Sequence, residues 1–366
     1  MSMNFWKEAK SPLFMLAPME DVTETSFREV VMRNSSPDNL NIVFTEFTST
    51  DGLCHPKGRD KVSERLVVSS SEAAVLKRKG IKIVAQIWGN SPEKFYNATK
   101  HIDEQYHFDG IDINMGCPVK NVVRKGCCSA LIGNPTLAGE IIQATKEATN
   151  LPVSVKTRTG VKTVVTEEWI GFMLEQQPDA IILHGRTQKQ MSDGTASWDE
   201  IKKAAQLRSQ MASSVKIIGN GDITSMHEAK EKVLNYGIDG AMIGRGIFAN
   251  PWLFSNGEKP TVTERLKTLE DHLLLFRHNW EGKKNYQILK RFFKIYLSEF
   301  RGAAELRARS METNGYDQML ELIKTAKAGF DQYETVQTPP SHLHPPHPQM
   351  EVEASEVPLY GKQLQP

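Results

Sequence analysis

Residues 110–135 read GIDINMGCPVKNVVRKGCCSALIGNP, and an apolar run within them stops abruptly at Asn114-Met115-Gly116-Cys117-Pro118. The β-rich beginning, with Ile111 and Ile113, predicts a buried strand, and the Gly-Cys-Pro sequence predicts a turn directly after it. Such a strand delivers a thiol to its carboxyl end. Enzymes built on parallel barrels keep their catalytic groups at that end of the strands.

Cys117 has two less specific interpretations. Most free cysteines are small buried hydrophobic residues, but Gly116 and Pro118 place this one in a turn. The other interpretation is a metal site shared with Cys127 and Cys128. The spacing argues against it, because zinc sites favour pairs two to four residues apart and adjacent cysteines cannot easily both face one ion. We therefore treat Cys117 as a candidate reactive group and expect no metal.

Length and composition set broad limits. The 366 residues are enough for one large domain and a smaller one. Charged residues make up 24% of the chain and the formal net charge is +1, so the overall balance neither indicates nor excludes a polyanionic partner. Four cysteines, no signal-like segment near residues 1–10 and no apolar run of membrane-spanning length predict a reduced, cytoplasmic protein that does not enter a membrane.

Short apolar segments alternate with helix-like segments between residues 13 and 244. The strand candidates are residues 13–18, 41–47, 82–88, 110–115, 152–157, 179–185, 215–220 and 239–244. These segments are apolar on both faces, and no glycine fingerprint follows the first one. Both features favour an α/β fold of the TIM (β/α)8 barrel type over an open doubly wound sheet.

Polar side chains gather at one end of the predicted barrel, at or just beyond the carboxyl ends of successive strands. They are Gln86, Asn114, Cys117, Lys156, Arg158, His184, Arg186, Asn220 and Asp222. One of them alone, such as His184, would more often be an ordinary core or surface residue. Because they recur in register, they predict a site at the barrel mouth.

Two glycine turns follow the last two predicted strands, Asn220-Gly221-Asp222-Ile223 and Gly244-Arg245-Gly246. Barrels commonly bind a phosphate with these two loops, through backbone N–H groups and a short helix N-terminus. Ordinary turns are the alternative. Arg245 between two glycines favours the phosphate site.

Helical periodicity replaces the strand pattern from Thr261 to about Phe330. Apolar residues repeat there at intervals of three and four, which predicts an amphipathic helix; they are Tyr286, Leu289, Phe293, Tyr296 and Phe300. Between Arg277 and Arg309, nine Lys or Arg residues stand against three acids. A solvated helix face and a contact with a nucleic-acid backbone explain this excess equally well.

The chain therefore divides into three predicted parts. Residues 1–255 form the barrel and residues 256–332 form an all-helical domain. Residues 333–366 form a disordered tail, because the stretch from residue 337 is rich in proline and polar residues.

Taken in order, the motifs resemble the signature set of the flavin-dependent tRNA-dihydrouridine synthases. They are Ala17-Pro18-Met19, Gln86, Asn114-Met115-Gly116-Cys117-Pro118, Lys156-Thr157-Arg158-Thr159-Gly160, His184-Gly185-Arg186-Thr187, Asn220-Gly221-Asp222-Ile223 and Gly244-Arg245-Gly246. The likeness runs from about Leu13 to Phe254. It continues more loosely through the helical segment, where residues 302–309 (GAAELRAR) are also similar to the family.

This resemblance implies a barrel that carries FMN across its mouth and a helical domain that helps to grip a folded tRNA. The implied reaction reduces the C5=C6 bond of a uridine, with NADPH or NADH as electron donor, and the target uridine must leave its stack to reach the pocket. The residues implied to hold the cofactor are Pro18, Met19, Glu20, Gln86, Lys156, His184, Asn220, Gly221, Asp222, Gly244 and Arg245.

The resemblance also assigns roles within the site. Lys156 would lie near the N1/O2 edge of the flavin, where a fixed positive charge stabilises the reduced ring. Cys117 would be the general acid that protonates C5 after hydride reaches C6, because a thiol with a pKa near 8.5 is mostly protonated at pH 7. Asn114, Arg158 and Arg186 would read the polar edge of the uracil.

Two departures from the family pattern affect loops. Glu20-Asp21 stands where small residues are common, and Cys127-Cys128 replaces a glycine-rich stretch. They bear on which uridine is selected rather than on the reaction.

Two alternatives differ in class. One is an FMN barrel oxidoreductase of a free pyrimidine or enone, similar to a dihydroorotate dehydrogenase, which needs no basic helical domain. The other is a barrel that binds tRNA without catalysis, against which Cys117, Lys156 and the phosphate motifs argue. We expect a monomer.

Overall fold

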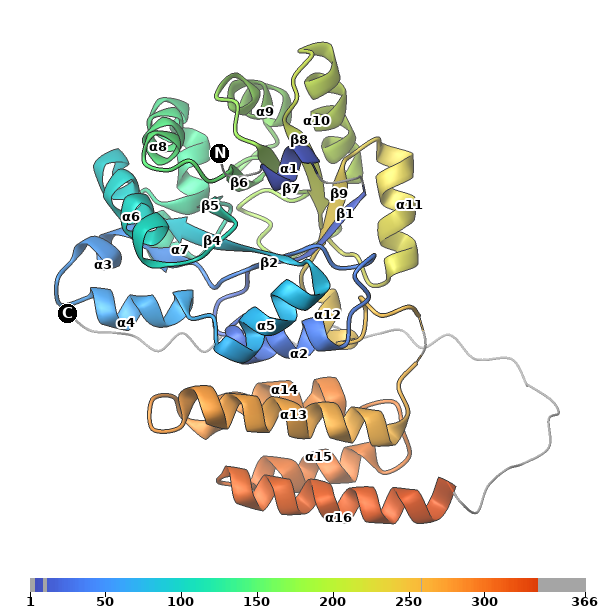
Figure 1. Cartoon of the computed structure of the whole chain (residues 1–366). Helices are drawn as coiled ribbons and strands as arrows, with labels where there is room; N and C mark the ends of the chain where they lie inside the picture. The colour runs from blue at the N-terminus through green and yellow to red at the C-terminus, as the bar shows by residue number, and fades with distance from the viewer. Residues whose placement is uncertain (1–3, 9–11, 258, 335–366) are drawn as a thin grey trace.

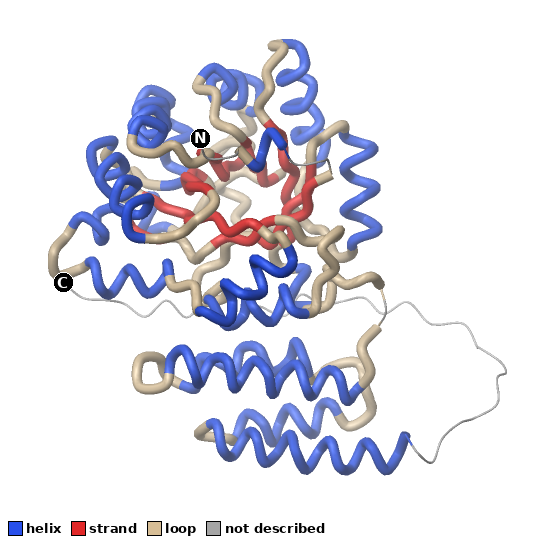
Figure 2. The backbone as a smooth tube through the Cα atoms, in the orientation of Figure 1, coloured by secondary structure: helices blue, strands red, loops and turns tan. Residues whose placement is uncertain are grey.

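The structure is a computed structural model that describes residues 4–8, 12–257 and 259–334. Its centre is a closed parallel barrel in the strand order β2-β1-β9-β8-β7-β6-β5-β4, and β2 pairs with β4 to complete the ring. Figure 2 shows this ring of strands with helices around it. The strands are β1 (Leu13–Leu16), β2 (Ile42–Phe44), β4 (Lys82–Trp88), β5 (Gly110–Met115), β6 (Val153–Arg158), β7 (Ala180–His184), β8 (Lys216–Asn220) and β9 (Gly240–Ile243), and the short β3 (Thr48–Ser49) pairs with the end of β4.

Each predicted strand overlaps a strand of the barrel, so the predicted TIM barrel is confirmed. The outer helices are α2 (Thr25–Arg33), α5 (Ser70–Lys79), α6 (Pro92–Gln105), α8 (Pro135–Glu147), α9 (Thr166–Glu175), α10 (Trp198–Gln210) and α11 (Met226–Tyr236). Most begin at a side chain that accepts a backbone N–H, as a stable N-cap requires; these caps include Ser69, Ser91, Asn134, Ser197 and Ser225.

Shorter elements fill the connections. They are α1 (Phe5–Glu8), α3 (Thr50–Cys54), α4 (Arg59–Ser63), η1 (Glu64–Leu66), α7 (Lys120–Val123), η2 (Cys128–Gly133) and α12 (Gly246–Ala249). In α1, Phe5 and Trp6 belong to the same buried cluster as inward-facing residues of the barrel, so this helix closes one end of it.

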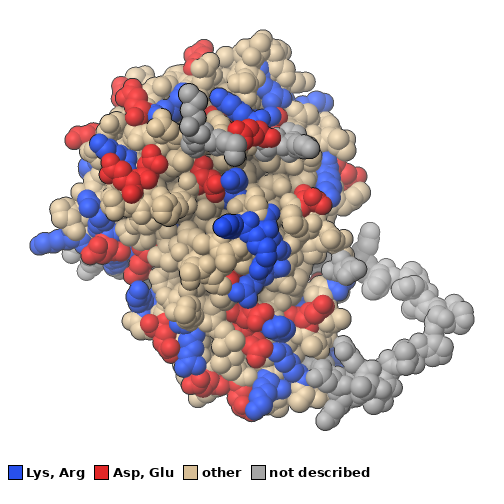
Figure 3. Space-filling model, viewed as in Figure 1, with Lys and Arg blue, Asp and Glu red and all other residues tan. Residues whose placement is uncertain are grey.

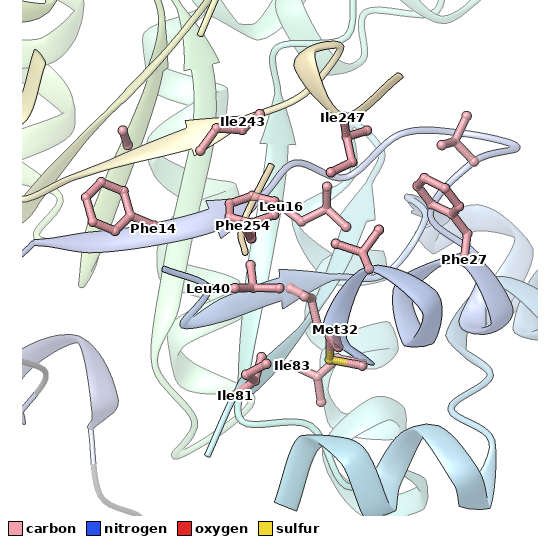
Figure 4. Close-up of a cluster of buried hydrophobic side chains, with 14 of the residues drawn as sticks. Phe14, Leu16, Phe27, Met32, Leu40, Ile81, Ile83, Ile243, Ile247 and Phe254 are labelled. Atoms are coloured by element: carbon pink, nitrogen blue, oxygen red, sulfur yellow. The ribbon is translucent and has the colours of Figure 1, made fainter. Parts of the chain in front are cut away.

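The barrel wall separates two hydrophobic cores, because successive residues of a strand point to opposite faces. Phe14 and Leu16 of β1 point outward into a cluster that also contains Ile243, Phe27 and Phe254, as Figure 4 shows. Met15, between them in sequence, points into the barrel. Alternation along one short strand thus supplies both cores.

The inside of the barrel is itself divided. The inward residues of β1, β2, β7, β8 and β9 are mostly apolar and include Met15, Phe44, Ile182, Ile218 and Met242. On β4 to β6 the inward residues are mostly polar, and the strand register sets Gln86 beside Asp112, Asp112 beside Ser154, and Asn114 beside Lys156. This polar half supplies Asn114, Lys156 and Arg158 to the mouth of the barrel. His184 and Asn220 reach the same mouth as the last residues of β7 and β8.

A helical region follows the barrel. It comprises α13 (Val262–Trp280), η3 (Tyr286–Leu289), α14 (Lys290–Tyr296), α15 (Ala303–Glu312) and α16 (Tyr316–Glu334). The predicted single helix from Tyr286 to Phe300 is divided into η3 and α14, and Phe300 lies beyond it. There the chain turns through the positive φ angles of Glu299 (62°) and Gly302 (86°). The other four apolar residues of the pattern are buried, as the periodicity predicts.

Contacts between α13, α14 and α2 dock the helical region against the barrel, below it in the view of Figure 1. Trp280 Nε1 donates to Glu24 Oε2 over 2.6 Å, Asn279 Nδ2 donates to Ser26 Oγ over 3.0 Å, and the rings of Phe27 and Phe292 stack 5.0 Å apart. The predicted domain limits at residues 255 and 332 stay predictions, and residues 335–366 of the predicted tail lie outside the described part of the chain.

Glu24 is the centre of this contact, because its carboxylate caps α2 by accepting the N–H groups of Ser26 and Phe27, both over 2.8 Å. Burial alone would raise the pKa of Glu24. His272, 3.9 Å away, together with Ser26 and Trp280, stabilises the carboxylate and lowers that pKa to about 2.

Within the described residues, no helix is long and apolar enough to cross a membrane.

Candidate active site

The strand ends bring the predicted polar residues together at one mouth of the barrel. Adjacent strands set Arg158 beside His184, and His184 beside Asn220. The loop after β1 reaches the same mouth, because Ala17 N–H donates to Ile243 O of β9 over 2.8 Å. In this loop Pro18 is buried, and Met19 and Glu20 are half-buried.

Two partners hold this first loop in place. Glu20 pairs with Arg65, whose Nε lies 2.9 Å from Glu20 Oε1. Glu46, just beyond β2, accepts the backbone N–H of Asp21 over 2.6 Å. Burial raises the pKa of Glu46 to about 7.

The turn that carries Cys117 is fixed by hydrogen bonds on both sides. Asn114 Oδ1 accepts the backbone N–H groups of Gly116 and Cys117, each over 3.0 Å. Ser129 Oγ donates to Cys117 O over 2.7 Å. A Cβ at Gly116 would lie 3.3 Å from Lys156 O, so glycine lets the turn pack against β6. Cys117 itself is half-buried.

The Cys117 thiol is more acidic than the sequence prediction assumed. A hydrogen bond with the Cys128 thiol outweighs burial and lowers the pKa of Cys117 to about 7, and the nearby charge of Arg158 acts in the same direction. Burial raises the pKa of Cys128 well above its usual value, so Cys128 keeps its proton. Cys128 has a φ of 54°, a left-handed conformation that brings its side chain to this position.

Lys156 lies beside this turn, and its Nζ donates to Asn220 Oδ1 over 3.0 Å. Asn220 Nδ2 donates to Met242 O over 2.8 Å, which fixes the orientation of the amide. Burial, with help from Arg158, lowers the pKa of Lys156 to about 8. The side chain therefore remains mostly charged at pH 7.

His184 is a neutral imidazole. Burial, together with the charges of Lys156, Arg158, Arg186 and Arg245, holds the pKa of His184 far below its usual range. Arg186 Nη1 lies 3.3 Å from His184 Nε2. Because a guanidinium group can only donate, Nε2 accepts and the ring proton resides on Nδ1.

The two predicted phosphate loops meet at Asp222, which accepts Arg186 Nη2 over 2.7 Å and Ala196 N–H over 2.8 Å. Arg245 Nη2 lies 3.3 Å from the other carboxylate oxygen. Gly221 has a φ of 140°, and a Cβ there would lie 2.4 Å from that of Ala196. The loops are thus packed closely enough to require glycine.

The two glycines of the neighbouring turn differ, because a Cβ added at Gly246 would lie only 2.3 Å from Ile223 O. A Cβ added at Gly244 would lie 3.6 Å from Ala17 Cβ, an ordinary contact. Arg245 is largely exposed, with 60% of its side-chain surface accessible.

Most of the Arg158 guanidinium group is engaged within the protein, whereas the sequence analysis assigned this residue to the uracil. Its Nε donates to Gly116 O over 2.7 Å, and its Nη1 donates to Thr187 O and Met191 O over 3.0 and 2.9 Å. These bonds brace the Cys117 turn against the loop after β7. The Nη2 group makes no hydrogen bond to the residues that the structure describes.

Sequence reasoning missed Asp112 and Ser154, which are buried inside the barrel. Ser154 Oγ donates to Asp112 Oδ1 over 2.6 Å. Asp112 stands two residues before Asn114, so the two-residue period of a strand already set both on one face. Among the residues that the structure describes, no three His, Cys, Asp or Glu side chains are grouped to hold a metal ion.

Comparison with known proteins agrees with this geometry. Residues 15–330 match the family model described as dihydrouridine synthase. A probable tRNA-dihydrouridine synthase of Staphylococcus aureus is 42% identical over 91% of this chain and 98% of its own length. Probable tRNA-dihydrouridine synthase 2 of Bacillus subtilis is 43% identical over 88% and 96%.

A solved structure of 2-naphthoyl-CoA reductase has a TM-score of 0.50 at 11% identity and covers 66% of this chain and 49% of its own; it shows the fold alone. The match to the family model and the two relatives extend through both the barrel and the helical region. The chain therefore belongs to the dihydrouridine synthase family.

Proposed function

We propose that this protein reduces the C5=C6 bond of uridines in tRNA, using bound FMN and, as electron donor, NADPH or NADH. The observation that carries the proposal is the fixed thiol of Cys117 beside the half-buried, charged Lys156 at a cationic barrel mouth. Membership of the dihydrouridine synthase family and similarity to two probable tRNA-dihydrouridine synthases support the same reaction.

The residues at the mouth fit a flavin with a phosphate tail. Lys156, Arg158, Arg186 and Arg245 are cations near one another, close enough that all four oppose protonation of His184. Asp222 pairs with two of them and leaves an excess of positive charge, which suits an anionic cofactor. Asn220, Gly221, Asp222, Gly244 and Arg245 would hold the phosphate, and Pro18, Met19, Glu20, Gln86, Lys156 and His184 the ring. A bound flavin supplies the hydride.

Cys117 holds the proton that the uracil C5 receives. Only the thiol form can donate, and a pKa of about 7 leaves a substantial fraction of it at neutral pH. The bonds from Asn114 and Ser129 keep the turn in one place, as a general acid requires.

Recognition of the uracil requires hydrogen-bond donors that contacts within the protein do not already use. Asn114 uses one amide N–H on Gln86 and has a second for a uracil carbonyl. Arg158 can offer Nη2. Arg186 is a weaker candidate, because its guanidinium group already contacts His184, Asp193, Gly194 and Asp222. We therefore assign Arg186 to positioning the loops and Asn114 to reading the base.

The helical region supplies contacts to the tRNA backbone. Several of its cations are engaged within the protein: Arg277 pairs with Asp317, Arg291 with Asp21, and Lys284 lies 3.8 Å from the centre of the Trp280 ring. Lys290 Nζ and Arg307 Nη1 donate to the backbone carbonyl groups of Met311 and Leu297. Within the described residues, no ion pair or side-chain hydrogen bond engages the other four basic residues between Arg277 and Arg309, which are Lys283, Lys294, Arg301 and Arg309. We propose these four for phosphate contacts.

Basic residues on the barrel are not equivalent to these four as candidates for phosphate contacts. Figure 3 shows Lys and Arg side chains gathered over α5, whose last turn carries Lys77, Arg78 and Lys79. Lys79 Nζ donates to the carbonyl groups of Met32 and Arg33 at the end of α2, over 2.6 and 3.1 Å. It is a cap of that helix rather than a phosphate ligand.

The four cysteines are free thiols, which suits the reducing cytoplasm.

The test is to purify the protein, record its visible spectrum and assay dihydrouridine in unmodified tRNA with NADPH. We expect a yellow protein that forms dihydrouridine. A yellow protein inactive on tRNA would instead indicate a reductase of small pyrimidines or enones. A colourless protein that binds tRNA would indicate a barrel without catalysis.

A further inference from the structure

Asp112 is a carboxylate at the centre of the barrel that the proposed reaction does not use. It lies in the middle of β5 and is 0% exposed. Its two oxygens accept Gln86 Nε2 over 2.7 Å and Ser154 Oγ over 2.6 Å. A buried carboxylate is costly unless its hydrogen bonds are satisfied, so its presence in the polar half needs a physical reason.

Hydrogen bonds run from Asp112 to the catalytic turn in one direction. Gln86 donates to Asp112 and, with its own Oε1, accepts Asn114 Nδ2 over 2.9 Å. Asn114 Oδ1 then accepts the backbone N–H groups of Gly116 and Cys117. Two side-chain amides therefore connect the carboxylate to the Cys117 backbone.

The two ends of this chain determine its direction. An amide can turn over and exchange its donor and acceptor ends, but a carboxylate ion only accepts and a backbone N–H only donates. Burial raises the pKa of Asp112 to about 6, so the group is mostly ionised at pH 7. If either amide turned over, two donors or two acceptors would face each other inside the barrel and leave buried polar groups without partners, which is costly.

We infer that Asp112 is a positioning residue, which fixes the amides of Gln86 and Asn114 in the orientation that holds the Cys117 turn. This inference rests on the proposed function of Cys117. Asp112 contacts neither the thiol nor the mouth, and acts through two intervening side chains.

Two substitutions separate the acceptor from the charge. Asp112→Asn removes the charge but retains an oxygen that can accept Gln86 Nε2, while its amide can donate to Ser154 Oγ. Asp112→Val removes the acceptor and leaves the Gln86 amide without a fixed orientation. Both variants are purified with cofactor, and dihydrouridine formation is followed over a range of tRNA concentrations.

We expect Asp112→Val to lower kcat roughly 10²-fold, the scale of a misplaced catalytic group, with the KM for tRNA nearly unchanged and flavin still bound. Asp112→Asn should retain most of the kcat that Asp112→Val loses. Rescue by the amide is a result that a merely structural role of the charged group would not produce.

Other outcomes overturn the inference. If Asp112→Asn is as slow as Asp112→Val, the charge that faces Lys156 matters and the direction of the amides does not. If both variants match the unaltered protein, Asp112 has no positioning role. Should Asp112→Val fail to fold, Asp112→Ala removes the same acceptor without a branched side chain and must give the same loss of kcat. An unaltered protein that forms no dihydrouridine would contradict the proposed function, a result distinct from these.

Discussion

The two halves of the barrel interior share one architecture and behave differently. Met15, Phe44 and Met242 fill the apolar half by packing, which has no direction and depends on volume. In the polar half, Gln86 and Asp112 are held by hydrogen bonds whose donors and acceptors must match. The apolar half stabilises the barrel, whereas the polar half orients Asn114 and the Cys117 turn at its mouth. Substitutions in the two halves should therefore have different consequences.

The largest expected effect lies at the end of the polar half. Cys117→Ala should lower the rate of dihydrouridine formation roughly 10²–10⁴-fold, the usual contribution of a general acid, while flavin content and NADPH oxidation persist. The matched control is Cys127→Ala, because Cys127 is buried nearby and, among the described residues, its thiol makes one hydrogen bond, to Lys125 O over 3.8 Å. Equal rates in the two variants would contradict the assignment.

The apolar half should show the opposite pattern. Phe44→Ala removes a fully buried ring and should lower the free energy of unfolding by about 3–5 kcal/mol. The kcat of the molecules that remain folded should change little, because no hydrogen bond to the Cys117 turn is lost. Urea unfolding and an assay at low temperature measure the two quantities. A large fall in kcat without loss of stability would remove the distinction between the halves.

A directional contact outside the barrel extends the comparison. The pKa of Glu24 is about 2 in the folded protein, below its usual 4.5. Its contribution of roughly 3 kcal/mol is therefore present above pH 4.5 and is lost as the pH falls from 4.5 towards 2. Glu24→Gln should remove this dependence, measured as the difference in unfolding free energy between pH 7 and pH 3.5. The exposed Glu312→Gln is the control and should keep it.

The smallest effect concerns the pair of thiols. Since only protonated Cys117 donates, the rate of uridine reduction should fall as the pH rises through about 7. Cys128→Ala removes the hydrogen bond that lowers the pKa of Cys117, so this decline should move to higher pH. At pH 8 the variant should be several-fold faster relative to its own maximum. An unchanged profile would show that Cys128 does not tune the thiol.

Local sequence patterns predicted the barrel well, because each strand carries its own apolar run and the polar residues follow directly after it. They predicted the positions of Lys156, His184 and Asn220 at one mouth for the same reason. They did not predict that Arg158 donates to Gly116 O, Thr187 O and Met191 O, because these carbonyl groups come from separate loops.

The sequence pattern also could not predict that Cys117 pairs with Cys128. This pairing depends on the left-handed backbone conformation of Cys128 at the start of η2. Asp112 was accessible in principle from the two-residue period of β5. Apolar periodicity also does not report the turn at Glu299 and Gly302, which leaves Phe300 beyond the end of α14.

Single-turnover reduction of tRNA is the most direct test of the central claim that the polar half orients Cys117 as the proton donor. The flavin is reduced beforehand and the donor removed, so that only the uridine step is observed after unmodified tRNA is added. The account predicts rapid return of the flavin absorbance in the unaltered protein and a rate at least about 10²-fold slower in Cys117→Ala. Equal rates in the two proteins would contradict it.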